Sequence, residues 1–265
     1  MKEAATVESP ITTVPEFVVA GMWGLVSGSG LLLGAIVADA LSGKLSHRMV
    51  SAIMGFGGGV LFAVIATELV VRPHAGGAAA WPTMALPAGA AIFSGINWYL
   101  AKRGARDRKR CGECVEQPNE AEHHGSGAAI AVGSVLDGIP EALVIGMSVA
   151  GGGAISLAVI VGFFLANVPQ GLSSTSGMKL AGRSRTYIYT IWIGIPLIIA
   201  IAAGAGNFLL GSASAQEPAI LLFAAGAVLA MLAEAMIPEA FENAPPFIGL
   251  ITVLGFLAAY LIAQH

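Results

Sequence analysis

The sequence predicts an all-α integral membrane protein with eight transmembrane helices. Of the 265 residues, 56% are hydrophobic and only 11% are charged, whereas about 25% of residues in a soluble domain carry charge. The apolar residues form segments long enough to cross the hydrocarbon of a bilayer, which takes about 20 residues. Lys and Arg gather in alternate connections between these segments. With a net charge of −3, the composition argues against nucleic acid as a partner.

The apolar segments divide the chain into four parts. Residues 1–16 form a short tail, 17–101 contain helices one to three, 102–127 form a loop, and 128–263 contain helices four to eight. The tail lacks the basic and then apolar order of a cleaved signal peptide. We expect the helices at residues 17–39, 49–71, 80–101, 128–150, 154–178, 186–210, 218–241 and 246–263.

The basic residues predict the orientation of these helices. On one side the connections contain only Lys2 and Arg72. On the other side they contain Lys44, Arg48, Lys102, Arg103, Arg106, Arg108, Lys109, Arg110, Lys179, Arg183 and Arg185. Because basic loops stay in the cytoplasm, we expect the second side to be cytoplasmic, both termini to lie outside, and the chain to reside in the inner membrane of a bacterial or archaeal cell.

Two acids lie inside the fourth apolar segment, in the stretch Gly133–Glu141 (GSVLDGIPE). Asp137 and Glu141 are four residues apart and therefore share a face of a helix. A carboxyl group at this depth is costly and is by default functional. The alternative is a structural acid that is hydrogen-bonded to a neighbouring helix. Asp137, with Ser134 one turn before it, is the stronger site candidate, and Glu141 is a ligand or a proton carrier.

A matching stretch lies in the fifth segment, Ala166–Gly171 (ANVPQG). Asn167 and Gln170 lie near the middle of the bilayer, where amides either hold helices together or contact a substrate. Pro140 and Pro169 are expected to interrupt their helices, as happens at the midplane sites of transporters.

Four further acids are expected along a polar path. Glu234 lies in the inner part of the seventh segment and is a candidate member of the site. Glu68 is expected near the outer end of its segment, and Asp39 and Glu239 near the inner ends. These three are either path residues or solvated residues at the mouths.

The sequence also contains a weak internal symmetry. The stretches Phe56–Gly59 (FGGG) and Phe223–Gly226 (FAAG) each precede an acid, Glu68 or Glu234. Their helices run in opposite directions, as an inverted repeat of helices one to three and six to eight requires.

At these residues the chain resembles the ZIP (Zrt-, Irt-like protein) family of divalent metal transporters. Many members carry His-Asn-x-Pro-Glu-Gly type motifs in helices four and five, which are similar to the stretches 133–138 and 166–171 here. The stretch Glu234–Ala240 (EAMIPEA) also resembles the seventh helix of the family. The resemblance implies import of a divalent cation, no tightly bound cofactor, a site carried by helices one, four, five and six, and a homodimer.

The motif histidines are replaced by Gly133 and Ala166, so the expected ligands are oxygens. We expect them from Ser134, Asp137, Asn167, Gln170 and Glu234. The family favours zinc as the cargo, whereas carboxylate and carbonyl oxygens suit a harder ion such as manganese or iron.

The loop 102–127 contains Cys111, Cys114, His123 and His124, which form a second candidate metal site on the cytoplasmic face. The alternative is a solvated loop whose basic residues contact lipid headgroups.

Other functions remain open at this stage. One is a carrier of another substrate, or a proton- or sodium-coupled carrier, on the same scaffold. Another is a membrane protein that senses metal without transporting it. An enzyme is not expected, because no Ser-His or His-Glu-x-x-His arrangement is present.

Overall fold

The computed structural model describes residues 14–41, 45–71, 81–105, 126–150, 156–211, 216–242 and 244–264. Within these ranges the chain is helical and contains no strand. Six of the helices described there are long and apolar enough to cross a membrane. They are Glu16–Ala40, His47–Val70, Ile130–Val149, Leu157–Leu180, Arg185–Leu210 and Glu217–Glu242. The prediction of a helical, membrane-embedded protein is confirmed.

The helix boundaries agree closely with the expected segments. The α-helices are α1 (Glu16–Ala40), α2 (His47–Val64), α4 (Ala85–Leu100), α5 (Ser126–Val149), α6 (Leu157–Leu180), α7 (Arg185–Leu210), α8 (Glu217–Met231), α9 (Ile237–Glu242) and α10 (Ile248–Ala263). Because α4 and α10 have only 16 residues each, the count of eight spans stays a prediction.

Short segments of other helix types extend several of these helices. Three are π-helical: η1 (Ile65–Val71) after α2, η3 (Ala101–Ala105) after α4, and η6 (Leu232–Met236) between α8 and α9. A 3₁₀ turn, η2 (Trp81–Met84), precedes α4.

The two membrane prolines differ from expectation. Pro140 and Pro169 lie inside α5 and α6, and both helices continue through them. Helices in a membrane tolerate a proline because neighbouring groups satisfy the freed backbone. The expected interruption of both helices is therefore wrong.

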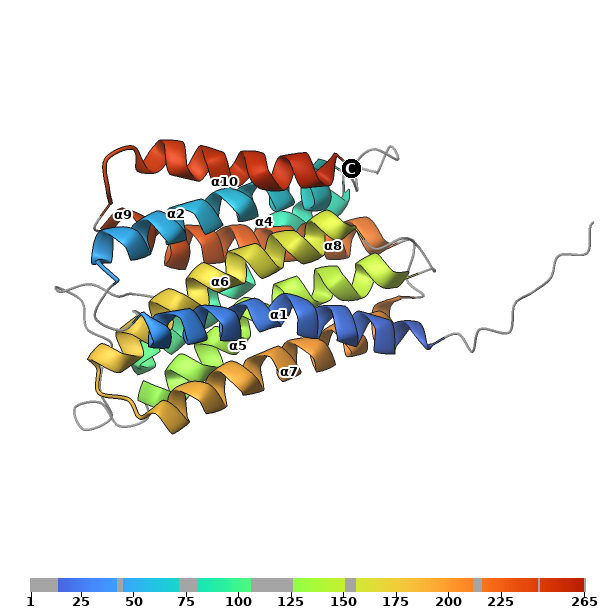
Figure 1. Ribbon diagram of the computed structural model, residues 1–265. Coiled ribbons are helices and arrows are strands. Elements are labelled where there is room, and N and C mark those ends of the chain that lie inside the picture. The colour runs from blue at the N-terminus through green and yellow to red at the C-terminus, as the bar shows by residue number, and fades with distance from the viewer. Residues whose placement is uncertain are drawn as a thin grey trace, which may run out of the picture.

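The helices form two groups that lie side by side (Figure 1). In the first group α1 packs against α6 and α7, and α5 packs against α7. In the second group α2 packs against α10, and α4 packs against α8. The groups meet mainly where α2 contacts α6 and α5 contacts α8. Figure 1 also shows that α1 begins at the end of the bundle where α10 ends.

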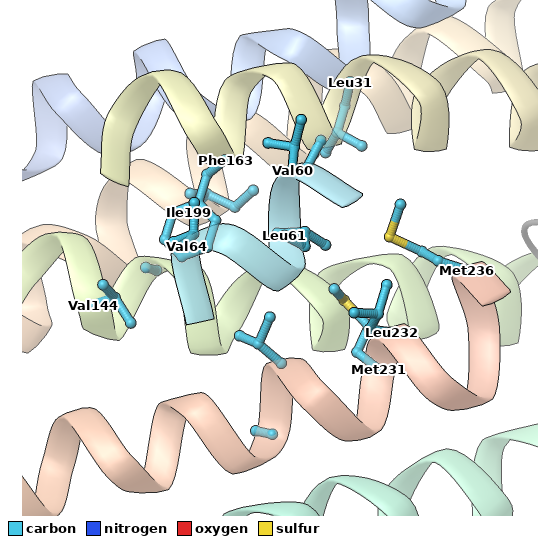
Figure 2. Packing of buried hydrophobic residues seen from close by; sticks show 14 of the residues in the cluster. Leu31, Val60, Leu61, Val64, Val144, Phe163, Ile199, Met231, Leu232 and Met236 are labelled. Atoms are coloured by element: carbon cyan, nitrogen blue, oxygen red, sulfur yellow. The ribbon is translucent and has the colours of Figure 1, made fainter. Parts of the chain in front are cut away.

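A buried hydrophobic core lies where the two groups meet. Figure 2 shows side chains of α2 between those of α6 and α8. The side chains labelled there are Leu31, Val60, Leu61, Val64, Val144, Phe163, Ile199, Met231, Leu232 and Met236. This apolar layer holds the two helix groups together.

Glycines set the closest helix contacts. A Cβ atom added to Gly59 of α2 would overlap the Thr252 carbonyl of α10, and one added to Gly171 of α6 would overlap the Leu31 carbonyl of α1. Close backbone approach of this kind supplies much of the packing energy between helices in lipid. It fixes how each helix is rotated about its axis.

Candidate functional site

One face of α5 carries the polar side chains of the GSVLDGIPE stretch. Ser134, Asp137 and Glu141 are spaced by three and four residues, which brings them onto the same side of the helix. The side chains are almost fully enclosed, with exposed fractions of 7%, 4% and 1%. A carboxyl group buried to this extent requires hydrogen-bonding partners, so this face of α5 points toward polar groups on other helices.

Those polar groups come from α6. Asn167, Gln170 and Ser174 also recur at three- and four-residue spacing, and all three are buried. Asn167 donates from Nδ2 to the Glu141 Oε2 atom at 2.9 Å and to the Ser27 carbonyl oxygen at 3.3 Å. With both amide hydrogens committed, Asn167 presents only its Oδ1 oxygen on the other side. Gln170 Nε2 lies 3.5 Å from that oxygen.

A cavity lies between these two faces, inside the first helix group. Its lining residues are Leu31, Ser134, Asp137, Gly138, Asn167, Gln170, Ser174 and Trp192. The cavity volume is about 10 Å³, room for roughly one water molecule. Four of the five predicted ligands therefore meet at one place, and Glu141 joins them through its hydrogen bond to Asn167.

The atoms at the cavity that could coordinate a cation are oxygens. Ser134 donates its hydroxyl hydrogen to the Ile130 carbonyl at 3.0 Å, which leaves its oxygen as an acceptor. Asp137 adds a carboxylate, and Asn167 adds an amide oxygen. In the described part of the chain no three His, Cys, Asp or Glu side chains come together to hold a metal ion. The arrangement suits one small cation bound by a single carboxylate and neutral oxygens.

No protein-family model matches the chain, and no curated protein matches it in sequence.

The fifth predicted ligand, Glu234, lies elsewhere. It sits in η6 and accepts hydrogen bonds from two residues of α4, Ser94 and Asn97, the second at 2.6 Å. These three residues line a separate hollow of about 640 Å³ together with Trp98 and Lys102. The expectation that Glu234 joins Asp137 is corrected, because the π-helical turn presents Glu234 to α4 instead.

Glu239 forms a contact between the two helix groups. It is 2% exposed and accepts a hydrogen bond from Ser173 of α6 at 2.7 Å. Its backbone carbonyl accepts another from Ser51 of α2 at 3.3 Å. Since Ser173 lies one helical turn beyond Gln170, Glu239 is close to the cavity along α6 without lining it.

The other expected path residues lie at the ends of their helices. Asp39 pairs with Lys179 at 2.5 Å and with Arg185 at 3.6 Å, and thereby joins α1, α6 and α7. Glu68 lies in η1 and lines a hollow of about 70 Å³ together with Glu217. The predicted loop site, Cys111, Cys114, His123 and His124, lies outside the described residues.

Sequence reasoning missed Trp192. It was not among the expected site residues, but it is 1% exposed and lines the cavity. Ser174 was not among the predicted ligands either, and it lines the same space. Local sequence gives no signal for Trp192, because its place at the cavity depends on how α7 packs against α5.

Proposed function

We propose that this protein is a ZIP-like secondary transporter that imports a divalent metal cation into the cytoplasm. The cation binds at the cavity inside the first helix group. Asp137 supplies the charge, and Ser134, Asn167 and Gln170 supply neutral oxygens. Glu141 fixes the amide of Asn167. Glu234 is not part of this site.

The observation that carries the proposal is the convergence of five polar side chains from α5 and α6 in an enclosed cavity. Each of these side chains is at most 7% exposed, and both helices are apolar enough to cross a membrane. Such a set is expensive to bury in a bilayer and marks a path for ions or polar substrates. The small volume favours an ion over an organic molecule.

The donor set favours a hard cation. Carboxylate and carbonyl oxygens suit Mg²⁺ and Mn²⁺, whereas imidazole and thiolate suit zinc and copper. The cavity residues contain neither imidazole nor thiolate. Manganese, and then iron, is therefore the preferred cargo, with zinc as the comparison ion.

Reciprocal glycine contacts support the eight-span inverted repeat. A Cβ on Gly255 would overlap the Phe56 carbonyl, and a Cβ on Gly89 would overlap the Phe223 carbonyl. Phe56 and Phe223 are the equivalent first residues of the FGGG and FAAG stretches. The contact of α2 with α10 thus has the same form as the contact of α8 with α4, which a repeat would produce.

The last glycines of the two stretches behave alike as well. A Cβ on Gly59 would overlap the Thr252 carbonyl, and a Cβ on Gly226 would overlap the Leu86 carbonyl. The acids that follow, Glu68 and Glu234, both lie in π-helical segments, which are frequent at functional sites. In the proposed repeat these features are related by the same symmetry.

Transport would occur by motion of the first helix group past the second. The cavity belongs wholly to α1, α5, α6 and α7, so these helices can carry it as a unit. The bond between Ser173 and Glu239 connects the groups and has to break during such a motion. The excess of Lys and Arg in alternate loops sets the orientation of the helices, so that both termini lie outside the inner membrane. The protein acts as a homodimer.

Cation uptake into liposomes tests the proposal. Purified protein is reconstituted, and uptake of Mn²⁺, Fe²⁺ and Zn²⁺ is compared for the parent, Asp137→Asn and Glu242→Gln. Glu242 is an exposed acid of α9 and controls for the loss of one negative charge. We expect Asp137→Asn to abolish uptake and Glu242→Gln to retain it. Uptake by the parent no faster than in protein-free liposomes would refute the proposal.

A further inference from the structure

Trp192 lines the cavity, and its indole nitrogen is a buried donor. Trp192 is 1% exposed and lines the cavity beside Asp137 and Asn167. Among the described residues no group accepts a hydrogen bond from its Nε1 atom. An indole N–H can only donate, and most buried polar groups in proteins have a partner. The natural partner of this nitrogen is therefore an acceptor inside the cavity.

We propose that the cavity binds one water molecule that accepts a hydrogen bond from Trp192 and donates to Asp137 or Asn167, and that the cation has to displace this water. The volume of about 10 Å³ matches a single water, which needs two to four polar partners. The hydrogen-bond donors and acceptors around the cavity come from α5, α6 and α7. In the cation-free protein this water therefore fills the cavity and links Trp192 to Asp137 or Asn167.

The same volume makes the water and the cation compete. There is room for one small occupant, so an arriving cation removes the acceptor of Trp192 and leaves its N–H without a hydrogen bond. A buried donor without a partner is costly. Trp192 therefore weakens cation binding, which assists release, since a transported ion has to leave its site as well as enter it. This role of Trp192 rests on the proposed function.

Calorimetric titration of Mn²⁺ tests the effect on affinity. Trp192→Phe keeps the ring and removes the N–H, so we expect it to bind Mn²⁺ about tenfold more tightly than the parent. Trp98→Phe is the matched control, because Trp98 lies at the other hollow and is 62% exposed. Its affinity is expected to equal that of the parent. A damaged site would bind the cation more weakly, so the sign of the change separates the proposed role from simple disruption.

The hydrogen bond itself is measured without altering Trp192. A variant with Trp23, Trp81 and Trp98 replaced by Phe keeps Trp192 as its sole indole, since the sequence has 4 Trp. Ultraviolet resonance Raman spectra report whether an indole N–H is hydrogen-bonded. We expect a bonded N–H without Mn²⁺ and a free N–H at saturating Mn²⁺. A free N–H in the cation-free protein would overturn the water site.

Asp137→Asn separates this inference from the proposed function. If Asp137→Asn loses Mn²⁺ binding while Trp192→Phe binds no more tightly than the parent, the role of Trp192 is wrong and the cation site stands. If the parent binds no divalent cation, the proposed function fails and the affinity role fails with it. The Raman spectrum of the cation-free protein then decides whether the water is bound.

Discussion

Glu141 and Asn167 lie on different helices and are joined by a hydrogen bond of 2.9 Å. Both side chains are almost fully buried, so the bond fixes the rotation of the Asn167 amide and directs its oxygen toward the cavity. The bond gives Glu141, which does not line the cavity, a role in the site. It also connects α5 to α6 about one helical turn from Asp137.

Replacing Glu141 tests this positioning role. In Glu141→Ala the Asn167 amide loses an acceptor and can rotate, so we expect Mn²⁺ affinity to fall about tenfold or more. Glu141→Gln keeps an acceptor oxygen without the charge and should lose only a small part of that affinity. Calorimetric titration of the two variants makes the comparison. If both variants lost the same Mn²⁺ affinity, Glu141 would act through its charge alone and not by positioning Asn167.

The Ser173–Glu239 contact predicts a stability difference between two neighbouring serines. Ser173→Ala removes a buried hydrogen bond between the helix groups and should lower the free energy of unfolding by about 1–3 kcal/mol. Ser176 donates only to the Leu172 carbonyl of its own helix, so Ser176→Ala should change stability by less than about 0.5 kcal/mol. Unfolding by titration with a denaturing detergent measures both. If Ser176→Ala lowered the free energy of unfolding by the same amount, the Ser173–Glu239 bond would not stabilise the protein more than a bond within one helix.

The repeat predicts that two distant glycines respond alike. Gly59→Ala and Gly226→Ala each place a methyl group against a backbone carbonyl, and each should destabilise the protein by about 1–3 kcal/mol. Gly194→Ala is the control, since a Cβ there meets nothing within 4 Å, and Ala is favoured over Gly in a helix by up to about 1 kcal/mol. Thermal unfolding in detergent ranks the three variants. If only one of the two contact glycines is sensitive, their proposed equivalence is wrong.

Glu234 is predicted to be dispensable for cation binding at the cavity. Its carboxylate is held by Ser94 and Asn97 in a separate hollow. Glu234→Gln should therefore leave the Mn²⁺ affinity within about twofold of the parent, a difference of under about 0.5 kcal/mol. Calorimetry compares it with Asp137→Asn, which should lose binding. A loss in Glu234→Gln as large as that in Asp137→Asn would place Glu234 at the cation.

Much of the helical framework could be predicted because it depends on local properties. Length and hydrophobicity define each apolar segment, and the observed boundaries lie within a few residues of the expected ones. Helical periodicity places Ser134, Asp137 and Glu141 on one face and Asn167, Gln170 and Ser174 on another. The π-helical turns were not predictable, because no residue type marks them. One of these turns carries Glu234 away from the expected site.

The sequence by itself determined which helices carry polar faces and where along each helix those faces lie, because helix rise and periodicity follow from the chain alone. Only the tertiary structure decided which faces meet. Contacts such as that of Gly171 with the Leu31 carbonyl set the rotation of each helix against its neighbour. They bring Asn167 to Glu141, Trp192 to the cavity, and Glu234 to α4. Such contacts join residues far apart in the chain, so local patterns do not encode them.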